Sequence, residues 1–293
     1  MRRCLAIIGV FLFLLAASSA PAQNWTPFED RVIGVASIQT VLDGVAAPDD
    51  SGSAVPLRTL NLAAPVASAP LSPDQALAAY LNGAQRQLAE LGAYSDATVI
   101  EADLPATAQH GKYELRRMYQ APRSLVFAAI RFAGDSFVKT NVITKLLQSE
   151  VEHVQKGEGA QTAITADNYK FNLKGTDTLD GRTYYRYQVK PRQKRPGLFK
   201  GFILVDAASG RLRRAEGTMV KSPSLFVKKI EFMQDYEEYG PFSLPVHIHS
   251  VAKTRLVGRA VVEIYHSGYE AKTVGETQSG AGSSASASGG GTN

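Results

Sequence analysis

The stretch that decides the fold is YKFNLKGTDTLDGRTYYRYQVK, residues 169–190. Apolar and polar side chains alternate from Tyr169 to Lys174 and again from Tyr184 to Lys190. Between the two runs, Asp180-Gly181 is a strong signal for a tight turn. Alternation with a period of two residues on both sides of a turn is typical of paired strands, so we expect an antiparallel hairpin here.

Strand-like segments of the same kind recur on both sides of this hairpin, from Thr98 to Tyr269. They number about nine and follow one another at the spacing that is typical of hairpins. Sheets built from so many consecutive short strands usually bend strongly and are open or partly closed as a barrel.

Two segments have helical periodicity instead. Ser72–Gly92 begins with a capping-box pattern and has its apolar side chains on one face, and Gly92 is expected to end the helix. Ser136–Lys156 also places apolar residues at helical spacing. The sequence therefore predicts an α+β fold, in which helices cover the concave face of a strongly curved antiparallel sheet, an unclosed β-barrel.

The chain begins with the pattern of an export signal. Arg2 and Arg3 precede an apolar run, and Ala20-Pro21-Ala22 fits a cleavage site. An uncleaved anchor is the alternative, but the run is shorter than the ~20 residues of a spanning helix. We expect four parts: a signal peptide (1–22), an Ala- and Pro-rich arm or linker (23–71), the half-barrel domain (72–270) and a disordered Gly/Ser-rich tail (271–293).

The composition narrows the location and the partners. Cys4 is the only cysteine and precedes the apolar run, so the mature chain has no disulfide and depends on its own core. The formal net charge of +5 is too mild for a nucleic-acid binder. We expect an exported protein of a bacterial periplasm, with secretion from the cell as the alternative.

Motifs for catalysis are absent from the sequence. It has no nucleophile elbow, no phosphate loop and no dinucleotide fingerprint, which favours a protein that is not an enzyme and needs no cofactor. A single Glu-x-x-His pattern, Glu150 to His153, is interpreted as a solvated helix face. His247 and His249 share one strand face and would need His266 as a third ligand to bind a metal, so a metal-dependent enzyme is the weakest alternative.

Two groups of side chains are candidates for binding. The first is a set of large apolar residues, which would form either an ordinary core or a cavity lining for an acyl chain: Phe171, Tyr185, Tyr187, Ile230, Phe232 and Ile264. The second is a basic stretch, which would be either a solvated hairpin tip or a docking site for anionic headgroups or an acidic partner: Lys190, Arg192, Lys194 and Arg195.

The order of several C-terminal features carries a family resemblance. These features are Tyr184 to Pro191, Phe199 to Asp206, Glu216-Gly217, Lys221 to Ser224 and Gly240 to Pro245. Between about Thr98 and Glu270, the chain resembles the outer-membrane lipoprotein-sorting family, the LolA-like group that includes the RseB type of sigma-factor regulator. The resemblance implies an unclosed barrel capped by helices, a hydrophobic cavity for acyl chains and an arginine inside it. Three arginines are candidates for that position: Arg116, Arg117 and Arg131.

The expected function is non-enzymatic binding of lipid or of lipoprotein acyl chains in the periplasm, with carriage to the outer membrane as one possible role. The alternative is an envelope sensor or scaffold that binds another protein. The expected partners are a lipid or lipidated protein and a protein of the inner or outer membrane, without nucleic acid.

Overall fold

The computed structural model describes residues 70–222, 227–255 and 258–277. The expected signal peptide, nearly all of the expected arm and the tail beyond residue 277 lie outside the described residues. Of the helices in the described ranges, none combines the length and the apolar character that crossing a bilayer requires.

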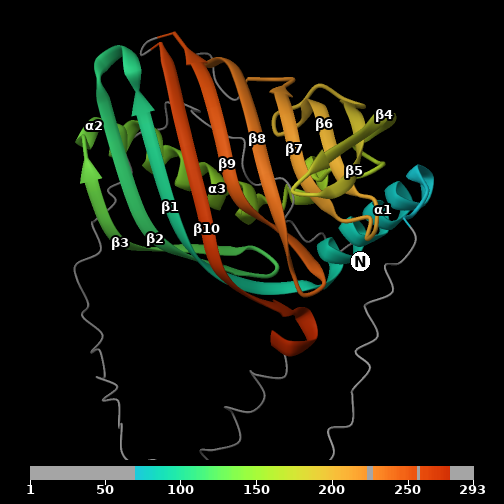
Figure 1. Cartoon of the computed structure of the whole chain (residues 1–293). Coiled ribbons are helices and arrows are strands. Elements are labelled where there is room, and N and C mark those ends of the chain that lie inside the picture. Colours follow the sequence, from blue (N-terminus) through green and yellow to red (C-terminus); the bar gives the residue numbers. More distant parts are fainter. Residues whose placement is uncertain (1–69, 223–226, 256–257, 278–293) are drawn as a thin grey trace, which may run out of the picture. The chain divides into compact units, whose positions relative to one another are not determined.

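Ten antiparallel strands form one sheet, in the order β3-β2-β1-β10-β9-β8-β7-β6-β5-β4 (Figure 1). The strands are β1 Leu91–Leu104, β2 Gln109–Gln120, β3 Ser124–Gly134, β4 Tyr169–Leu179, β5 Arg182–Pro191, β6 Phe199–Asp206, β7 Leu212–Met219, β8 Val227–Tyr239, β9 Phe242–Thr254 and β10 Arg259–Thr273. The two outer strands, β3 and β4, are edges, so the sheet is not closed. The expected α+β class with an unclosed antiparallel barrel is confirmed.

Both expected helices are present. α1 (Pro73–Glu90) begins with the predicted capping box, because the Ser72 hydroxyl accepts from the Gln75 amide and the Gln75 side chain accepts from the Ser72 amide. The second helix runs continuously through α2 (Ser136–Val138), the π-helical segment η2 (Lys139–Ile143) and α3 (Thr144–Lys156). Two further short helices are η1 (Pro105–Thr107) and α4 (Gly159–Thr162), and residues 274–277 after β10 are also helical.

The expectation for Gly92 is wrong. α1 ends at Glu90, and Gly92 already belongs to β1. A Cβ atom at Gly92 would lie 2.5 Å from the carbonyl oxygen of Thr273. The glycine is therefore required by the close approach of β1 to the end of β10, and not by the end of the helix.

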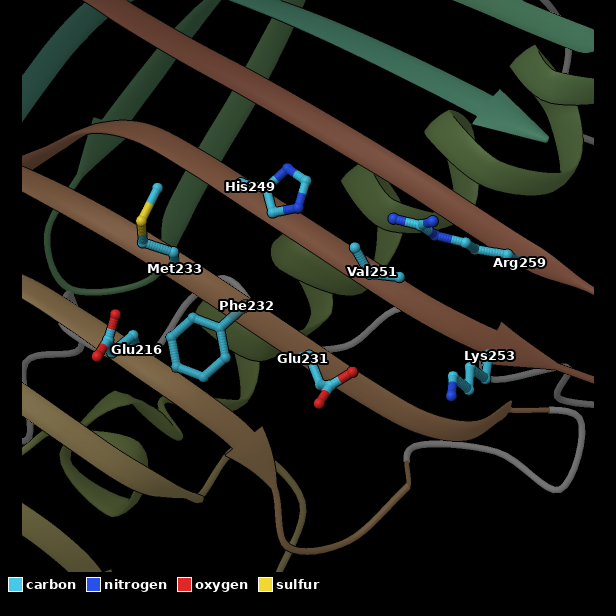
Figure 2. Close-up of a pocket in the computed structure, with 8 residues that line it drawn as sticks. All are labelled: Glu216, Glu231, Phe232, Met233, His249, Val251, Lys253 and Arg259. Carbon is cyan, nitrogen blue, oxygen red and sulfur yellow. The ribbon is translucent and has the colours of Figure 1, made fainter. Parts of the chain in front are cut away.

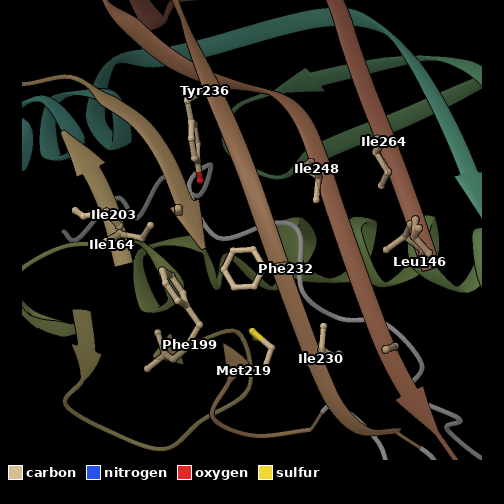
Figure 3. Close-up of a cluster of buried hydrophobic side chains, with 14 of the residues drawn as sticks. Leu146, Ile164, Phe199, Ile203, Met219, Ile230, Phe232, Tyr236, Ile248 and Ile264 are labelled. Atoms are coloured by element: carbon tan, nitrogen blue, oxygen red, sulfur yellow. The ribbon is translucent and has the colours of Figure 1, made fainter. Parts of the chain in front are cut away.

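The helices and one face of the sheet enclose the main core. α3 crosses behind β1, β10 and β9 in Figure 1. Leu146 of α3 belongs to the same buried cluster as Ile248 of β9 and Ile264 of β10 (Figure 3). Full burial of each such side chain stabilises the fold by ~1.5–3 kcal/mol, so this apolar layer is what holds the helices on the sheet.

Candidate functional site

A buried cluster of charged and polar side chains joins α3 to the sheet. Its centre is Arg117 of β2, whose Nε donates a hydrogen bond to Asp96 Oδ2 at 2.8 Å. Its two terminal nitrogens donate to Glu150 Oε1 at 3.2 Å and to the Tyr269 hydroxyl at 2.6 Å. The side chains of Arg117, Asp96 and Glu150 are each at most 3% exposed. One guanidinium is therefore the counter-ion of two buried carboxylates.

Strand pairing and helical spacing bring these groups together. Asp96 of β1 and Arg117 of β2 are cross-strand partners, so their side chains leave the sheet side by side. Glu150 lies on the buried face of α3, one turn after Leu146. The helix thus places a carboxylate over a sheet position that already holds an ion pair.

His266 extends the cluster on β10. Its Nδ1 lies 3.0 Å from Asp96 Oδ1 and 2.9 Å from the Thr98 hydroxyl oxygen. The Thr98 hydroxyl donates to the same Asp96 oxygen at 2.5 Å. Asp96 therefore forms hydrogen bonds with side chains of three strands, β1, β2 and β10.

The surroundings move the pKa values of these groups in different directions. Burial raises the pKa of Asp96, but the hydrogen bond with His266 and the charge of Arg117 outweigh it and lower that pKa to about 2. Burial raises the pKa of Glu150 to about 7, although Arg117 opposes the shift. Burial and the Arg117 charge lower the pKa of His266 to about 4. At neutral pH, Asp96 and Arg117 are therefore ionised, His266 is neutral, and Glu150 is near its midpoint.

Two sequence-based interpretations change here. Of the three candidate arginines, Arg117 lies inside the fold, whereas the side chains of Arg116 and Arg131 are 54% and 70% exposed. The Glu-x-x-His pattern is not a solvated helix face. Glu150 and His153 are both 3% exposed, and the ring of His153 contacts Glu158 and Thr162.

The six candidate cavity residues all lie in or against the main core. Four are buried, with exposed fractions of 6% or less: Tyr187, Ile230, Phe232 and Ile264. Phe171 and Tyr185 are partly buried and pack against the same cluster. The rings of Phe171 and Tyr80 of α1 meet edge to face at 6.5 Å. The structure therefore brings the predicted set together on the helix-covered face of the sheet.

The candidate basic residues lie where β5 ends and β6 has not begun. Lys190, Arg192 and Lys194 are exposed. Arg192 donates from Nε to the Ala166 carbonyl at 2.8 Å, and Arg195 donates to the Asn168 side-chain oxygen at 2.6 Å. Within the described ranges, none of the four forms an ion pair with a carboxylate.

The three histidines considered for a metal do not converge. His247 and His249 both contact the Glu263 carboxylate, at 2.8 and 2.5 Å. His266 is buried in the polar cluster on the opposite face of the sheet, bonded to Asp96. Among the described residues, no group of three or more His, Cys, Asp or Glu side chains is arranged to hold a metal ion.

A pocket of about 340 Å³ lies on the sheet face that the helices do not cover (Figure 2). Its walls come from strands β7 to β10. Most of the lining side chains alternate along the strands with those that enter the core, whereas Phe232 itself belongs to the core. Eight residues line it: Glu216, Glu231, Phe232, Met233, His249, Val251, Lys253 and Arg259. Sequence patterns missed this site because its residues look like an ordinary solvated strand face.

The fold places the chain in a class, that of unclosed antiparallel half-barrels with helices on one face. One family model matches residues 162–271, less than half of the chain, and is described as a family of unknown function (DUF5686). A comparison with curated proteins finds no match.

Several solved structures are similar. One is a LolA superfamily protein from Nitrosomonas europaea, at 12% identity and a TM-score of 0.34, over 66% of this chain and 92% of that chain. Another is the MucA/MucB complex of Pseudomonas aeruginosa, at 11% identity and a TM-score of 0.22, over 64% and 90%. A third is the lipoprotein LppX of Mycobacterium tuberculosis, at 11% and 0.21, over 68% and 96%.

With identities near one residue in eight and TM-scores below 0.5, these likenesses do not establish what this chain binds.

Proposed function

We propose that this protein is an exported, non-enzymatic binder of acyl chains, from lipids or from lipidated proteins, in the bacterial periplasm. The ligand enters the apolar layer between the sheet and the α2-η2-α3 segment. The export pattern of residues 1–22 supports the location, and the LolA-like resemblance supports carriage to the outer membrane as its role.

The observation that carries the proposal is the way in which α3 is attached. Leu146, Ile143 and Val142 rest on the apolar face of the sheet through contacts that have no direction. Among the described residues, Arg117–Glu150 is the one ion pair between α3 and the sheet. A bound acyl chain could replace the apolar contacts, at ~0.8 kcal/mol per buried methylene. Movement of the helix then depends mainly on a single polar contact.

The polar cluster itself supports binding rather than catalysis. Asp96, Thr98, Arg117 and His266 are at most 5% exposed, so a substrate would not reach them without displacing α3. Their hydrogen bonds are made to one another across three strands. We interpret the cluster as the polar contact that holds the α2-η2-α3 segment on the sheet.

Lipid analysis tests this function directly. We expect solvent extraction and mass spectrometry of the purified protein to find bound lipid, and a fluorescent fatty acid to bind the delipidated protein. We also expect ligand to increase hydrogen exchange in α3, because the helix has to move. Absence of extractable lipid together with no fatty-acid binding would reject the proposal.

A matched pair of variants locates the site. Leu147→Ala shortens a partly buried side chain of α3 that packs against the core, and we expect it to weaken fatty-acid binding several-fold. Ile130→Ala removes an apolar side chain that is 67% exposed on the edge strand β3, and should leave binding unchanged. Equal effects of the two variants would place the ligand elsewhere.

A specific observation favours a second function, binding of another protein. β3 is an edge strand and exposes two large apolar side chains, Val126 at 51% and Ile130 at 67%. An unpaired edge with apolar residues is a template for an added strand. If this surface binds a protein of the envelope, Ile130→Lys should abolish its recovery in a pull-down and leave fatty-acid binding intact. Recovery of the same protein by wild type and Ile130→Lys would exclude this edge.

A further inference from the structure

One edge of the sheet collects cations from turns that are far apart in the sequence. In the antiparallel series from β4 to β10, successive turns alternate between the two ends of the strands, and in this subsection 'edge' means one such row of strand ends. The C-terminal ends of β5, β7 and β9 therefore lie in one row with the N-terminal ends of β6, β8 and β10. We use the name cationic edge for six exposed side chains in the β5–β6 and β9–β10 connections of this row and the adjoining strand ends: Lys190, Arg192, Lys194, Lys253, Arg255 and Arg259.

The cations of this edge outnumber the carboxylates near them. Within residues 70–222, 227–255 and 258–277, no carboxylate forms an ion pair with any of the six. Three carboxylates lie at the same ends of the strands, Asp103, Asp167 and Glu231. Glu231 is paired with Lys229 at 2.6 Å, and the charge of Lys253 also helps to lower its pKa. The edge therefore keeps a surplus of positive charge.

The other edge of the sheet is arranged differently. Its arginines have carboxylate partners, as in Arg182 with Asp206 at 3.0 Å and Arg211 with Glu238 at 3.2 Å. Arginines are thus neutralised on one side of the sheet, while cations remain free on the other. This segregation is a property of the fold, because the basic residues of the cationic edge are about sixty residues apart in sequence.

Two of the cations face each other directly. Lys253 of β9 and Arg259 of β10 are cross-strand partners, and both line the outer-face pocket (Figure 2). Like charges at such positions have Cβ atoms about 5 Å apart and destabilise the pair. An anion that lies between them relieves the repulsion, which gives this part of the edge an affinity for negative groups.

We propose that the cationic edge is a docking surface for an anionic phospholipid bilayer. The two groups of cations are four strand spacings apart, which is about 20 Å along the sheet. A partner therefore has to present negative charges over that span, which a single small anion cannot do. A bilayer with anionic headgroups does so over a wide surface, and the long Lys and Arg side chains at the same ends of the strands can reach it together.

The docking proposal is independent of acyl-chain binding, and vesicle flotation tests it on the full mature chain. We expect the protein to float with vesicles that contain phosphatidylglycerol and not with vesicles of phosphatidylcholine alone. Binding should weaken as salt is raised, because the attraction is between exposed charges. Equal flotation with both kinds of vesicle would overturn the proposal.

Two variants of equal charge make the test specific. Lys253→Gln with Arg255→Gln and Arg259→Gln removes half of the cationic edge. At about fivefold per cation, it should lower the vesicle partition coefficient by on the order of 100-fold. The control, Arg86→Gln with Arg123→Gln and Lys272→Gln, removes three exposed cations that lie elsewhere and should change it little.

Equal losses in both variants would reduce the effect to net charge and refute the edge as a site. Binding of poly-glutamate tests the alternative that the partner is an acidic protein. Should it bind the wild type more tightly than anionic vesicles do, and lose binding in the edge variant, the bilayer would be excluded as the partner.

Discussion

At the scale of single residues, Arg117 has the largest structural role among the charged groups. It is buried between two carboxylates, and its guanidinium also lies 4.9 Å from the centre of the Tyr94 ring. Because one cation serves two anions, the cluster has a surplus negative charge whenever Glu150 is ionised. The stability of the α3 attachment should therefore respond both to the loss of the cation and to pH.

Loss of the cation should be costly. Arg117→Leu leaves Asp96 and Glu150 buried without a counter-ion, and we expect the free energy of unfolding to fall by ~3–5 kcal/mol. Urea denaturation followed by circular dichroism measures it. Arg116→Leu, next to it in sequence but exposed, should change stability by less than about 0.5 kcal/mol. A triple variant with Asp96→Asn and Glu150→Gln should recover part of the loss, and no recovery would contradict the role of Arg117 as counter-ion.

Removal of the surplus charge should change the pH dependence. The pKa of Glu150 is about 7 in the folded protein, above its ordinary value of 4.5, so folding takes up protons between these pH values. Its contribution to the free energy of unfolding therefore falls as pH rises through that window. The pKa of His266 is about 4, below its ordinary 6.5, so its contribution rises with pH in that range. In the wild type, the two effects oppose each other.

Glu150→Gln removes the falling contribution and leaves that of His266. We expect the free energy of unfolding of this variant to rise more steeply between pH 4.5 and 6.5 than that of the wild type. The difference in slope is at most about 1.4 kcal/mol per pH unit. Glu152→Gln, on the exposed face of α3, is the control and should follow the wild-type profile. Parallel profiles for wild type and Glu150→Gln would show that Glu150 ionises normally.

At the scale of helices and strands, local signals predicted the elements better than their ends. The capping box at Ser72 and the apolar spacing in 136–156 gave both helices correctly. The start of β1 was missed, because residues 91–97 contain Gly, Ser and Asp, which are poor strand formers. That segment is a strand because β2 and β10 pair with it on both sides.

The same limit applies to the candidate site. Arg116 and Arg117 are adjacent, so they point to opposite faces of β2, and sequence alone does not tell which face α3 covers. The sequence does not identify the partners of Arg117, which are Asp96, Tyr269 and, through Asp96, His266. Strand register brings these residues together, and their spacing in the sequence does not encode that register. The apolar set on β4, β5, β8 and β10 could be predicted, since alternation within each strand defines its buried face.

The capping box offers a test at this scale. Ser72→Ala removes the side-chain acceptor for the Gln75 amide, and we expect it to destabilise the protein by ~1 kcal/mol. Thermal denaturation should record a lower Tm. Gln85→Ala, at an exposed position in the same helix, should have no comparable effect. An unchanged Tm for Ser72→Ala would mean that α1 is held by its packing alone.

At the scale of the whole molecule, the sheet is joined in its middle by strands from opposite ends of the domain. β1 and β10 pair along most of their length, as in Thr98 with His266. Hairpin signals predict neighbours in sequence, so they anticipated the series β4 to β10 but could not place β10 beside β1.

Removal of β10 should therefore abolish the fold. We expect a chain that ends at Gly258 to lose cooperative thermal unfolding, because β1 and β9 both lose a partner and His266 and Tyr269 leave the polar cluster. A chain that ends at Thr277 keeps every described element and should unfold like the full chain. Cooperative unfolding of the shorter chain would contradict this view of the sheet.

The pairing of the first strand with the last also determines how late in biosynthesis the sheet can be completed. Thr98 and His266 are 168 positions apart, and at ribosomal rates the interval between their appearance is on the order of 10 s. Throughout that interval, the nascent polypeptide holds only incomplete partial sheets, which cannot stabilise one another. Completion of the polypeptide and completion of its tertiary structure must therefore nearly coincide, and until then the chain remains a client for holding chaperones.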